Sequence, residues 1–393
     1  MAKGHQISGS DLAQSELTDA LAKKGITVQI GQRAENISAD LDMVVYSPAI
    51  KADNPELLKA KSYNLKAISY PQALGELTRQ YTTIAISGSH GKSTTTAMTA
   101  LILVKAGIDP TVIVGTKLRE FGNTNFRVGA SKYLVIEACE YDGSFLEYSP
   151  TIAVITNVDK EHLDYFKTFA NVKKAFKDFA KKIPADGFLI TEKNLPMKDA
   201  KKLKLQVPGK HNISNALAAL SVARILGVDD TISFAALAEF SGTWRRFEVK
   251  EVGPSTLDPR RYTLVSDYGH HPTEVAATLK AAREKFGKKK IWCIFQPHQH
   301  QRTYYLFKDF VKLFKNIKID EIIITDIYDV AGREEKNINE KVDSQLLVKK
   351  IGKKNVHYMP LRTVEQFIGE QIEADNILII MGAGDIYKLF DKF

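Results

Sequence analysis

The chain has 393 residues, of which 44% are hydrophobic and 26% charged, and its formal net charge is +9. This length predicts two or three globular domains. No apolar run approaches the ~20 residues that cross a bilayer, and residues 1–10 lack the apolar core of a signal peptide. The lysines are scattered without interleaved aromatic residues, which argues against nucleic-acid binding and favours small anionic substrates. Two cysteines, Cys139 and Cys293, form no disulfide framework and fit a reducing compartment.

Apolar strands alternate with helical stretches along nearly the whole chain, which predicts an α/β fold with parallel sheets. The first 80 residues hold three such strands, at 25–30, 43–47 and 66–69. Helical segments lie between them, so we expect a small α/β unit. No internal repeat and no low-complexity tract is found in the sequence.

The most specific pattern lies at residues 83–96, where a β-branched apolar run ends in a glycine turn and a helix-compatible segment follows. The turn has the short Gly-x-x-Gly-Lys-Ser form of a phosphate-binding loop, and its residues are Gly88, Ser89, His90, Gly91, Lys92, Ser93 and Thr94. The glycines let backbone N–H groups face a polyphosphate, and the helix N-terminus adds partial positive charge. Lys92 can reach the β- and γ-phosphates, and the Ser93 hydroxyl can bind Mg²⁺. The competing interpretation is a structural turn, which the flanking strand and helix disfavour.

Two further groups of polar residues follow strands of the same central unit. Glu137 and Glu140 come directly after the strand at 133–136, and His162 follows the strand at 151–156. Parallel sheets bind ligands at the carboxyl ends of their strands. A carboxylate and a histidine from neighbouring strand ends could therefore hold a divalent ion against a nucleotide. The alternatives are a solvated loop for the glutamates and a locally satisfied helix start for the histidine.

A third unit begins near residue 247, with predicted strands at 262–266, 291–295, 321–325 and 376–381. The motif after the first of these contains His270 and His271, but consecutive histidines cannot easily converge on one ion, so a zinc site is disfavoured. The motif after the second contains His298 and Arg302, whose position favours contact with an anion or substrate over loop filler. The glycine turn at 382–386 lacks the third glycine of a dinucleotide fingerprint.

In their order and spacing, these motifs resemble the Mur ligases of peptidoglycan synthesis. The match begins at residue 8 and rests on segments 88–95, 137–142, 156–164, 209–219, 245–247, 267–274, 295–303 and 382–386. Tyr268-Gly269 and Gln296-Pro297-His298 are more similar to the branch that adds L-alanine to UDP-N-acetylmuramate than to the branch that recycles murein tripeptide. The resemblance implies three α/β domains: a Rossmann-like UDP-sugar-binding domain (1–80), a central P-loop ATPase domain (81–243) and a Rossmann-like C-terminal domain that binds the amino acid (244–393).

The resemblance also assigns expected contacts to individual residues. These are Lys92 with the phosphates of ATP; Ser93, Glu137 and His162 with Mg²⁺; His211, Asn212 and Asn215 with adenine or its ribose; Arg246 and Asp267 with the nucleotide from the C-terminal side; and His270, His298 and Arg302 with the muramoyl carboxylate and the incoming alanine. The implied route is phosphorylation of the carboxylate by ATP, followed by attack of the alanine amine on the acyl phosphate. Lys92, Mg²⁺ and Arg246 would spread the transition-state charge, and His270 or His298 is the candidate base.

The chain departs from the family pattern at three places. It begins after the first strand and the glycine-rich loop that cradle the UDP diphosphate in the family, so we expect a truncated N-terminal domain that binds the sugar nucleotide weakly. The segment between Thr191 and Gly209 is shorter than usual. Cys139 stands where Asp is usual and Gln299 where Arg is usual, which affects one expected substrate contact.

Other expectations concern the molecule's class and surroundings. The alternatives are a ligase that recycles murein tripeptide and a nucleotide-binding scaffold without turnover. The expected partners are UDP-N-acetylmuramate and L-alanine, with no nucleic acid and no membrane insertion, for a cytoplasmic monomer or weak homodimer. In some relatives a carbamoylated lysine helps to hold a second Mg²⁺; Lys177 has plausible spacing, but a solvated helix face is the favoured interpretation.

Overall fold

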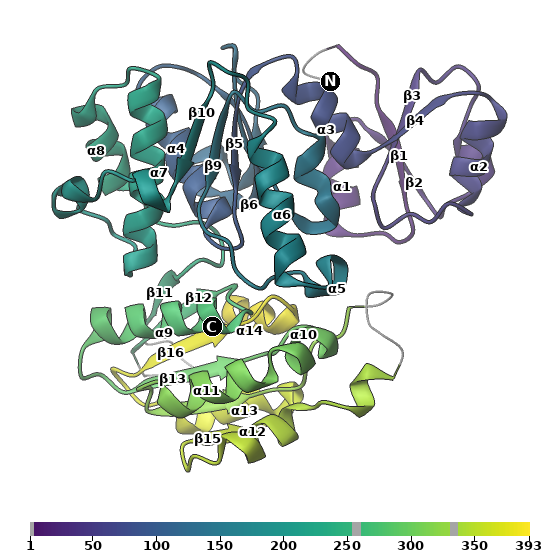
Figure 1. Ribbon diagram of the computed structural model, residues 1–393. Helices are drawn as coiled ribbons and strands as arrows, with labels where there is room; N and C mark the ends of the chain where they lie inside the picture. Colours follow the sequence, from purple (N-terminus) through teal and green to yellow (C-terminus); the bar gives the residue numbers. More distant parts are fainter. Residues whose placement is uncertain (1–3, 254–260, 331–336) are drawn as a thin grey trace.

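The computed structural model of the protein describes residues 4–253, 261–330 and 337–393. Figure 1 shows three parts: an N-terminal unit beside a central domain, and a C-terminal domain below them. None of the helices in the described ranges has the length and apolar character that a bilayer crossing requires.

The N-terminal unit consists of two small parallel sheets, one pairing β1 with β2 and the other pairing β3 with β4. Its strands are β1 (Ser8–Asp11), β2 (Thr27–Ile30), β3 (Met43–Tyr46) and β4 (Lys66–Ser69), and its helices are α1 (Glu16–Lys23), α2 (Pro55–Ser62) and α3 (Tyr70–Thr78). Glu56 connects β1 to helix α2 and to the segment around Asn36, because its carboxylate accepts hydrogen bonds from Ser10 (2.8 Å) and Asn36 (2.6 Å). The three strands expected here are present, and β1 was not predicted.

The central domain has a six-stranded sheet in the order β10-β9-β5-β8-β6-β7, parallel except for the edge strand β7. Its strands are β5 (Thr82–Ser87), β6 (Thr111–Leu118), β7 (Thr124–Arg127), β8 (Tyr133–Glu137), β9 (Ile152–Ile155) and β10 (Phe188–Thr191). Its helices are α4 (Lys92–Lys105), α5 (Leu163–Phe166), α6 (Phe169–Ala180), α7 (Lys210–Ile225) and α8 (Asp230–Glu239). The middle strand β5 is almost wholly buried, which explains its unbroken apolar run.

Helices cover both faces of this sheet. On one face α4, α7 and α8 pack over Ile84 and Ile86 of β5. On the other face α6 buries Val172, Phe176 and Phe179, which lie at helical spacing along one side of the helix. Both faces of β5 are therefore fixed by packing, and its carboxyl end opens into the phosphate-binding loop.

The C-terminal domain has a second six-stranded sheet in the order β11-β12-β16-β13-β14-β15, parallel except for the edge strand β11. Its strands are β11 (Glu248–Val252), β12 (Tyr262–Asp267), β13 (Ile291–Phe295), β14 (Glu321–Ile324), β15 (Val356–Tyr358) and β16 (Ile377–Met381). Its helices are α9 (Pro272–Phe286), α10 (His300–Tyr305), α11 (Phe307–Asn316), α12 (Ser344–Ile351), α13 (Leu361–Gln371) and α14 (Lys388–Lys392). Parallel sheets were expected, and the antiparallel edge strands β7 and β11 are the exceptions.

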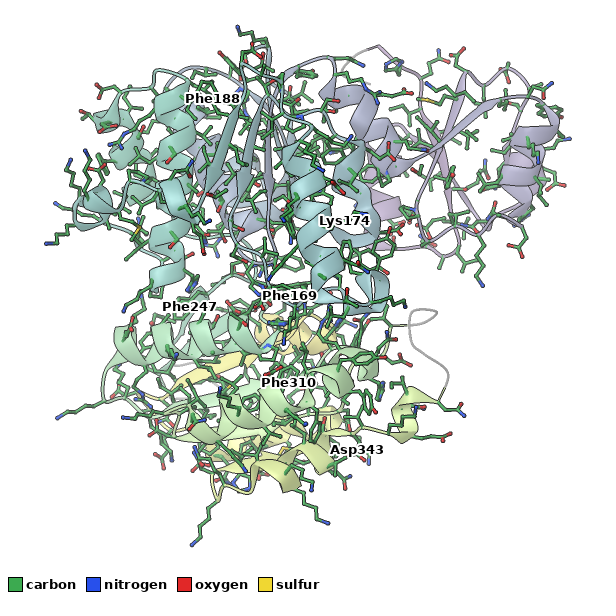
Figure 2. All side chains as sticks on the ribbon, in the orientation of Figure 1. Phe169, Lys174, Phe188, Phe247, Phe310 and Asp343 are labelled. Atoms are coloured by element: carbon green, nitrogen blue, oxygen red, sulfur yellow. The ribbon has the colours of Figure 1, made fainter. Side chains whose placement is uncertain are left out.

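Local sequence explains how this domain meets the central one. Figure 2 places Phe310 inside the C-terminal domain and Phe247 where the chain passes into it. Both side chains belong to the same buried cluster, so the connection is anchored in that core. Helix α9 begins with a capping box between His271 and Glu274 and has Pro272 in its first turn. This cap fixes the loop that faces the central domain.

Candidate active site

The phosphate-binding loop connects β5 to α4 and requires its two glycines. Gly88 has φ +133° and Gly91 has φ +84°, the region in which side chains are strained. A Cβ atom at Gly88 would lie 2.0 Å from Thr156 Oγ1, and one at Gly91 would lie 2.4 Å from Asn215 Oδ1. Close packing against β9 and α7 therefore holds the loop at the N-terminus of α4.

Lys92 is folded back onto this loop. Its Nζ donates to the carbonyls of Gly88 (2.6 Å) and Ser89 (3.2 Å) and forms an ion pair with Glu140 (2.9 Å). Burial disfavours the charged form, but Glu140 and its neighbours outweigh burial and hold the pKa of Lys92 above its usual value. Lys92 is thus a fixed cation at the loop.

The two glutamates after β8 have different surroundings. Glu140 is fully buried, and its Oε1 lies 3.7 Å from His162 Nε2 as well as within reach of Lys92. Glu137, the residue expected at Mg²⁺, accepts a hydrogen bond from Gly115 N (2.7 Å). Burial lowers the pKa of His162, which favours the neutral imidazole that binds cations. The sequence analysis placed both glutamates at this strand end and assigned only Glu137 to the metal. Sequence spacing alone does not show that the carboxylate facing Lys92 of the loop is that of Glu140.

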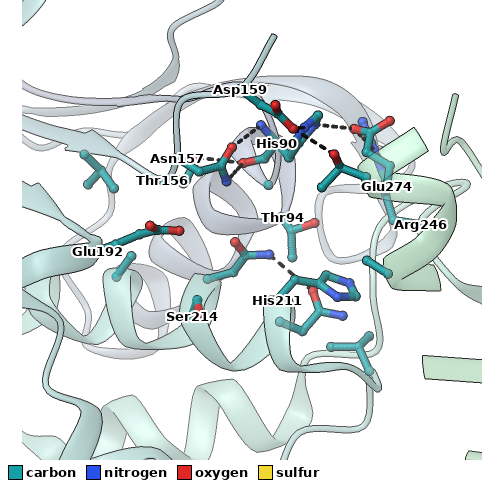
Figure 3. Close-up of a pocket in the computed structure, with 18 of the residues that line it drawn as sticks. His90, Thr94, Thr156, Asn157, Asp159, Glu192, His211, Ser214, Arg246 and Glu274 are labelled. Carbon is teal, nitrogen blue, oxygen red and sulfur yellow. Dashed lines mark hydrogen bonds and ion pairs between the residues drawn. The ribbon is translucent and has the colours of Figure 1, made fainter. Parts of the chain in front are cut away.

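A pocket of about 320 Å³ lies beside the loop, between the central and C-terminal domains (Figure 3). It contains most of the residues expected at the nucleotide, namely His90, Gly91, Thr94, His211, Asn212, Asn215, Arg246 and Asp267. Gly88, Ser89, Lys92 and Ser93 belong to the adjoining loop but not to this lining. Apolar side chains such as Ile190, Leu195 and Phe240 form another part of the wall, so the pocket suits a ligand with a flat apolar part and a charged end.

The expected residues Arg246 and Asp267 differ in how free they are to meet a ligand. Asp267 accepts hydrogen bonds from Phe247 N, Gly269 N (both 2.8 Å) and Thr278 Oγ1 (3.1 Å), and burial raises its pKa. Arg246 is partly exposed, with its guanidinium 4.8 Å from the Tyr268 ring and 3.9 Å from Glu274. Asp267 therefore holds the loops in place, while Arg246 retains donors for a ligand.

His90 of the phosphate-binding loop connects the two domains. Its Nε2 lies 3.1 Å from Asp159 of the central domain, and its Nδ1 lies 3.1 Å from Glu274 of α9. Burial disfavours a charged imidazole, but the two carboxylates outweigh burial and raise the pKa of His90 to about 10. His90 is therefore an imidazolium between two carboxylates at neutral pH.

One potential ligand atom each from His90, Asp159 and His271 lies within 4.8 Å of the other two, a spacing that a metal ion can use. As an imidazolium, His90 donates from Nδ1 to Glu274 and from Nε2 to Asp159, so this ring has no lone pair to offer. His271 belongs to this cluster, whereas the neighbouring His270 faces His298 instead, so the two adjacent histidines lie in different parts of the site.

The remaining candidates, His270, His298 and Arg302, lie together at the carboxyl ends of β12 and β13. The rings of His270 and His298 are 5.7 Å apart, and His298 stacks on Tyr328 at 5.5 Å. Burial lowers the pKa of His270 to about 4 and that of His298 to about 3, so both are neutral at pH 7.

The hydrogen-bond partners give the two neutral histidines opposite tautomers. His270 Nδ1 lies 3.1 Å from the carbonyl of Tyr268, which can only accept, so Nδ1 carries the proton and Nε2 has a free lone pair. His298 Nδ1 lies 3.0 Å from Arg302 Nη1, which can only donate, so the proton of His298 is on Nε2. His270 can therefore accept a proton at Nε2, and His298 can donate a hydrogen bond there.

The sequence predicted no role for two acidic residues in this region, Glu161 and Glu274, and it named Glu140 without assigning it to a ligand. Glu161 is buried and pairs with Arg302, and Glu274 pairs with His90. All three lie inside motifs already recognised, but each acts on a residue distant in sequence. Lys177 lies on the exposed side of α6, which agrees with the solvated helix face that was favoured for it.

Comparison with known proteins identifies relatives along the whole chain. Three family sequence profiles match: "Mur ligase family, catalytic domain" over residues 1–82, "Mur ligase middle domain" over 86–204 and "Mur ligase, glutamate ligase domain" over 245–384. A UDP-N-acetylmuramate–L-alanine ligase of Clostridium botulinum is 38% identical, over 98% of this chain and 92% of its own. The corresponding ligase of Caldanaerobacter subterraneus is 39% identical, over 100% of this chain and 92% of its own.

Comparison with solved structures also finds similar proteins. The UDP-N-acetylmuramate–alanine ligase of Thermotoga maritima superposes with a TM-score of 0.78 at 28% identity, covering 100% of this chain and 93% of that one. A murein peptide ligase of Psychrobacter arcticus superposes with a TM-score of 0.68 at 22% identity, which shows a shared fold only.

Proposed function

The chain belongs to the Mur ligase family, and from that premise we propose that it joins L-alanine to the carboxylate of UDP-N-acetylmuramate at the expense of ATP. The observation that carries this proposal is the convergence of the phosphate-binding loop, the pocket and the His270–His298–Arg302 cluster at one boundary between two domains. The relatives that are 38% and 39% identical over nearly the whole chain are alanine-adding ligases, whereas the murein peptide ligase is only 22% identical, so recycling of murein tripeptide is not favoured.

Formation of an amide in water requires that the carboxylate first be activated as an acyl phosphate. In this proposal the pocket holds ATP, with adenine against its apolar wall and the phosphates at residues 88–94. Lys92 offsets the charge of the transferred phosphoryl group, and Arg246 approaches it from the C-terminal domain. Two anions can then meet without strong repulsion.

Mg²⁺ fits the residues between the loop and β8. Glu140 offers a fully buried carboxylate, His162 a neutral imidazole 3.7 Å away, and Ser93 a hydroxyl at the start of α4. Hard oxygen ligands with one nitrogen suit a divalent cation that also holds phosphate oxygens. We assign Ser93, Glu140 and His162 to this ion, with Glu137 kept as a candidate. When bound, the cation would neutralise phosphate charge.

The two histidines would divide the second half of the reaction. The alanine amine must lose a proton to attack the acyl phosphate, and the free Nε2 of His270 can accept it. Glu274 Oε2 lies 3.4 Å from His270 Nδ1 and can stabilise the imidazolium that forms. His298 would donate a hydrogen bond, and Arg302 would face the carboxylates of the substrates.

The finer surroundings of the reaction are also proposals. Residues 1–80 would bind the UDP part of the sugar nucleotide, and residues 81–243 and 244–393 would hold ATP and the amino acid. We propose that the reaction takes place in the cytoplasm, which the need for ATP and the two free cysteines, Cys139 and Cys293, support, and that the chain acts as a monomer or weak homodimer.

The test is release of ADP by the purified chain. We expect release to require both UDP-N-acetylmuramate and L-alanine, and mass spectrometry should detect the amide. Replacing alanine with murein tripeptide should give no product. ATP turnover that is indifferent to the sugar nucleotide would contradict the proposal and favour a nucleotide-binding scaffold.

A further inference from the structure

One buried ion pair crosses the domain boundary on the substrate side. Glu161 lies in the loop after β9 of the central domain, and Arg302 lies on α10 of the C-terminal domain. Glu161 Oε1 accepts hydrogen bonds from Arg302 Nη2 (3.0 Å) and Nε (3.3 Å). The side chains are only 5% and 11% exposed, so water does not compete freely for this contact.

The contacts of Arg302 with Glu161 also determine where the rest of its guanidinium points. The guanidinium of Arg302 is planar, so two contacts to one side of it fix the orientation of the third nitrogen. That nitrogen, Nη1, donates to His298 Nδ1 (3.0 Å) and to the carbonyl of His298 (3.3 Å).

This arrangement connects a residue of one domain to the tautomer of a histidine in the other. Arg302 can only donate, so His298 Nδ1 must act as the acceptor in this contact, and the proton of the neutral ring lies on Nε2. The stacking of His298 on Tyr328 holds the ring in that orientation. If Glu161 did not anchor it, Arg302 could rotate away and His298 could adopt either tautomer.

We propose that Glu161 is a positioning residue for the ligation: it anchors Arg302 across the domain boundary and so fixes His298 as a hydrogen-bond donor only when the two domains are closed. This inference rests on the proposed function, since it concerns how the same site is assembled. It predicts that the Glu161 carboxylate affects the amino-acid side of the reaction and not the binding of ATP.

The first test observes the tautomer directly, without turnover. In the full chain labelled with ¹⁵N-histidine, the His298 signals are identified by their loss in His298→Gln. We expect the wild type to show an unprotonated Nδ1 and a protonated Nε2, and Glu161→Gln to lose that pattern. Asp199→Asn is the matched control, because Asp199 is also buried and paired with an arginine, Arg224, but within the central domain. An unchanged His298 pattern in Glu161→Gln would overturn the proposal.

A second variant covers the case in which Glu161→Gln does not fold. Arg302→Lys keeps the charge beside Glu161, but one ammonium group cannot reproduce the planar contacts to both Glu161 and His298. We expect it to fold and to lose the same His298 pattern. Retention of the wild-type pattern by this variant would also count against the proposal.

The kinetic test separates positioning from general damage. We expect Glu161→Gln to lower kcat/KM for alanine by about 10- to 100-fold, the range typical when an orienting partner is lost, while KM for ATP stays within about twofold. Glu161→Asp should recover part of the loss, and Asp199→Asn should keep wild-type kinetics. Equal behaviour of Glu161→Gln and Asp199→Asn would refute the positioning role. A wild type that does not ligate alanine would instead refute the proposed function, and the NMR result would still decide the positioning.

Discussion

At the scale of single residues, the site is made of charges that stay fixed because each has a buried partner. Lys92 shows this most clearly, since it is held by two carbonyls and by Glu140. A loop that must receive a polyphosphate would otherwise have to order a flexible lysine at each turnover. Replacing these partners by phosphate oxygens keeps the ammonium paired throughout.

Lys92→Ala should therefore slow ligation severely. It removes a donor to the transferred phosphoryl group, and loss of one such donor typically costs about 10²–10³ in rate. The measurement is steady-state ADP release at saturating substrates. Lys105→Ala is the matched control, because Lys105 lies at the far end of the same helix, α4, and pairs there with Glu239 of α8. If Lys92→Ala turned over as fast as this control, residues 88–94 would be only a structural turn.

The tautomers of the two histidines lead to a prediction about pH. Burial lowers the pKa of His270 to about 4, so its Nε2 stays unprotonated at all pH values above about 4. A base with the ordinary histidine pKa of about 6.5 would lose activity below that pH. We therefore expect kcat/KM for alanine to show no acid limb near pH 6.5. His270→Asn should lower kcat by about 10²–10⁴, the usual contribution of a general base. A limb at pH 6–7 that disappears in His270→Asn would contradict the lowered pKa.

At the scale of elements, the loops that follow the carboxyl ends of the strands carry the residues of the site. Both sheets bring their loops to the domain boundary, so the phosphate-binding loop and the motifs after β8, β9, β12 and β13 meet there. The loop after β5 depends on two residues with positive φ, and Gly91 also touches α7 through Asn215. A side chain at Gly91 would thus disturb both the loop and the pocket wall.

Gly91→Ala should weaken ATP binding and lower the melting temperature. Its Cβ would lie 2.4 Å from Asn215 Oδ1 at φ +84°, so the loop or the asparagine must shift. A displacement of ~1 Å near the reacting groups can cost about 10²-fold in turnover. Gly107→Ala is the control, since it has φ +75° but no heavy atom within 4 Å of the added Cβ. Equal effects of the two substitutions would mean that backbone strain alone, and not contact with Asn215, limits this position.

The sequence predicted most of the elements that carry the site, because buried parallel strands such as β5 and β13 are unbroken apolar runs and motifs follow them directly. It missed β1, β6, β7, β10, β11 and β15, all of which except β6 lie at sheet edges, where the apolar pattern is weaker. Sequence alone could not pair Glu161 with Arg302, because that contact joins residues 141 positions apart on different domains. The same reason hid which glutamate, 137 or 140, faces Lys92.

At the scale of the whole molecule, charged contacts hold the central and C-terminal domains together around the pocket. Asp159 accepts a hydrogen bond from Thr273 (2.8 Å), His90 contacts Glu274, and Glu161 contacts Arg302. Polar contacts of this kind can break and reform during turnover, whereas a large apolar interface would resist opening. We infer that closure excludes water from the acyl phosphate and that reopening releases product.

Closure should also depend on pH, through His90. Its pKa is about 10 in the closed arrangement, above the ordinary value of 6.5, because Asp159 and Glu274 outweigh burial. Opening separates His90 from Glu274, one of the two carboxylates that raise this pKa. A raised pKa stabilises the closed form fully below the open-form value, and this stabilisation is lost as pH rises through about 10.

We therefore expect the radius of gyration from small-angle X-ray scattering to increase between pH 7 and pH 10 in the wild type. His90→Gln keeps a hydrogen-bonding side chain but cannot carry the charge, so its radius should be larger at pH 7 and should not change over this range. His357→Gln is the matched control, because His357 faces Glu321 at 3.7 Å on the exposed surface of the C-terminal domain, away from the boundary. A pH response that persists in His90→Gln, or is lost in His357→Gln, would mean that other groups control closure.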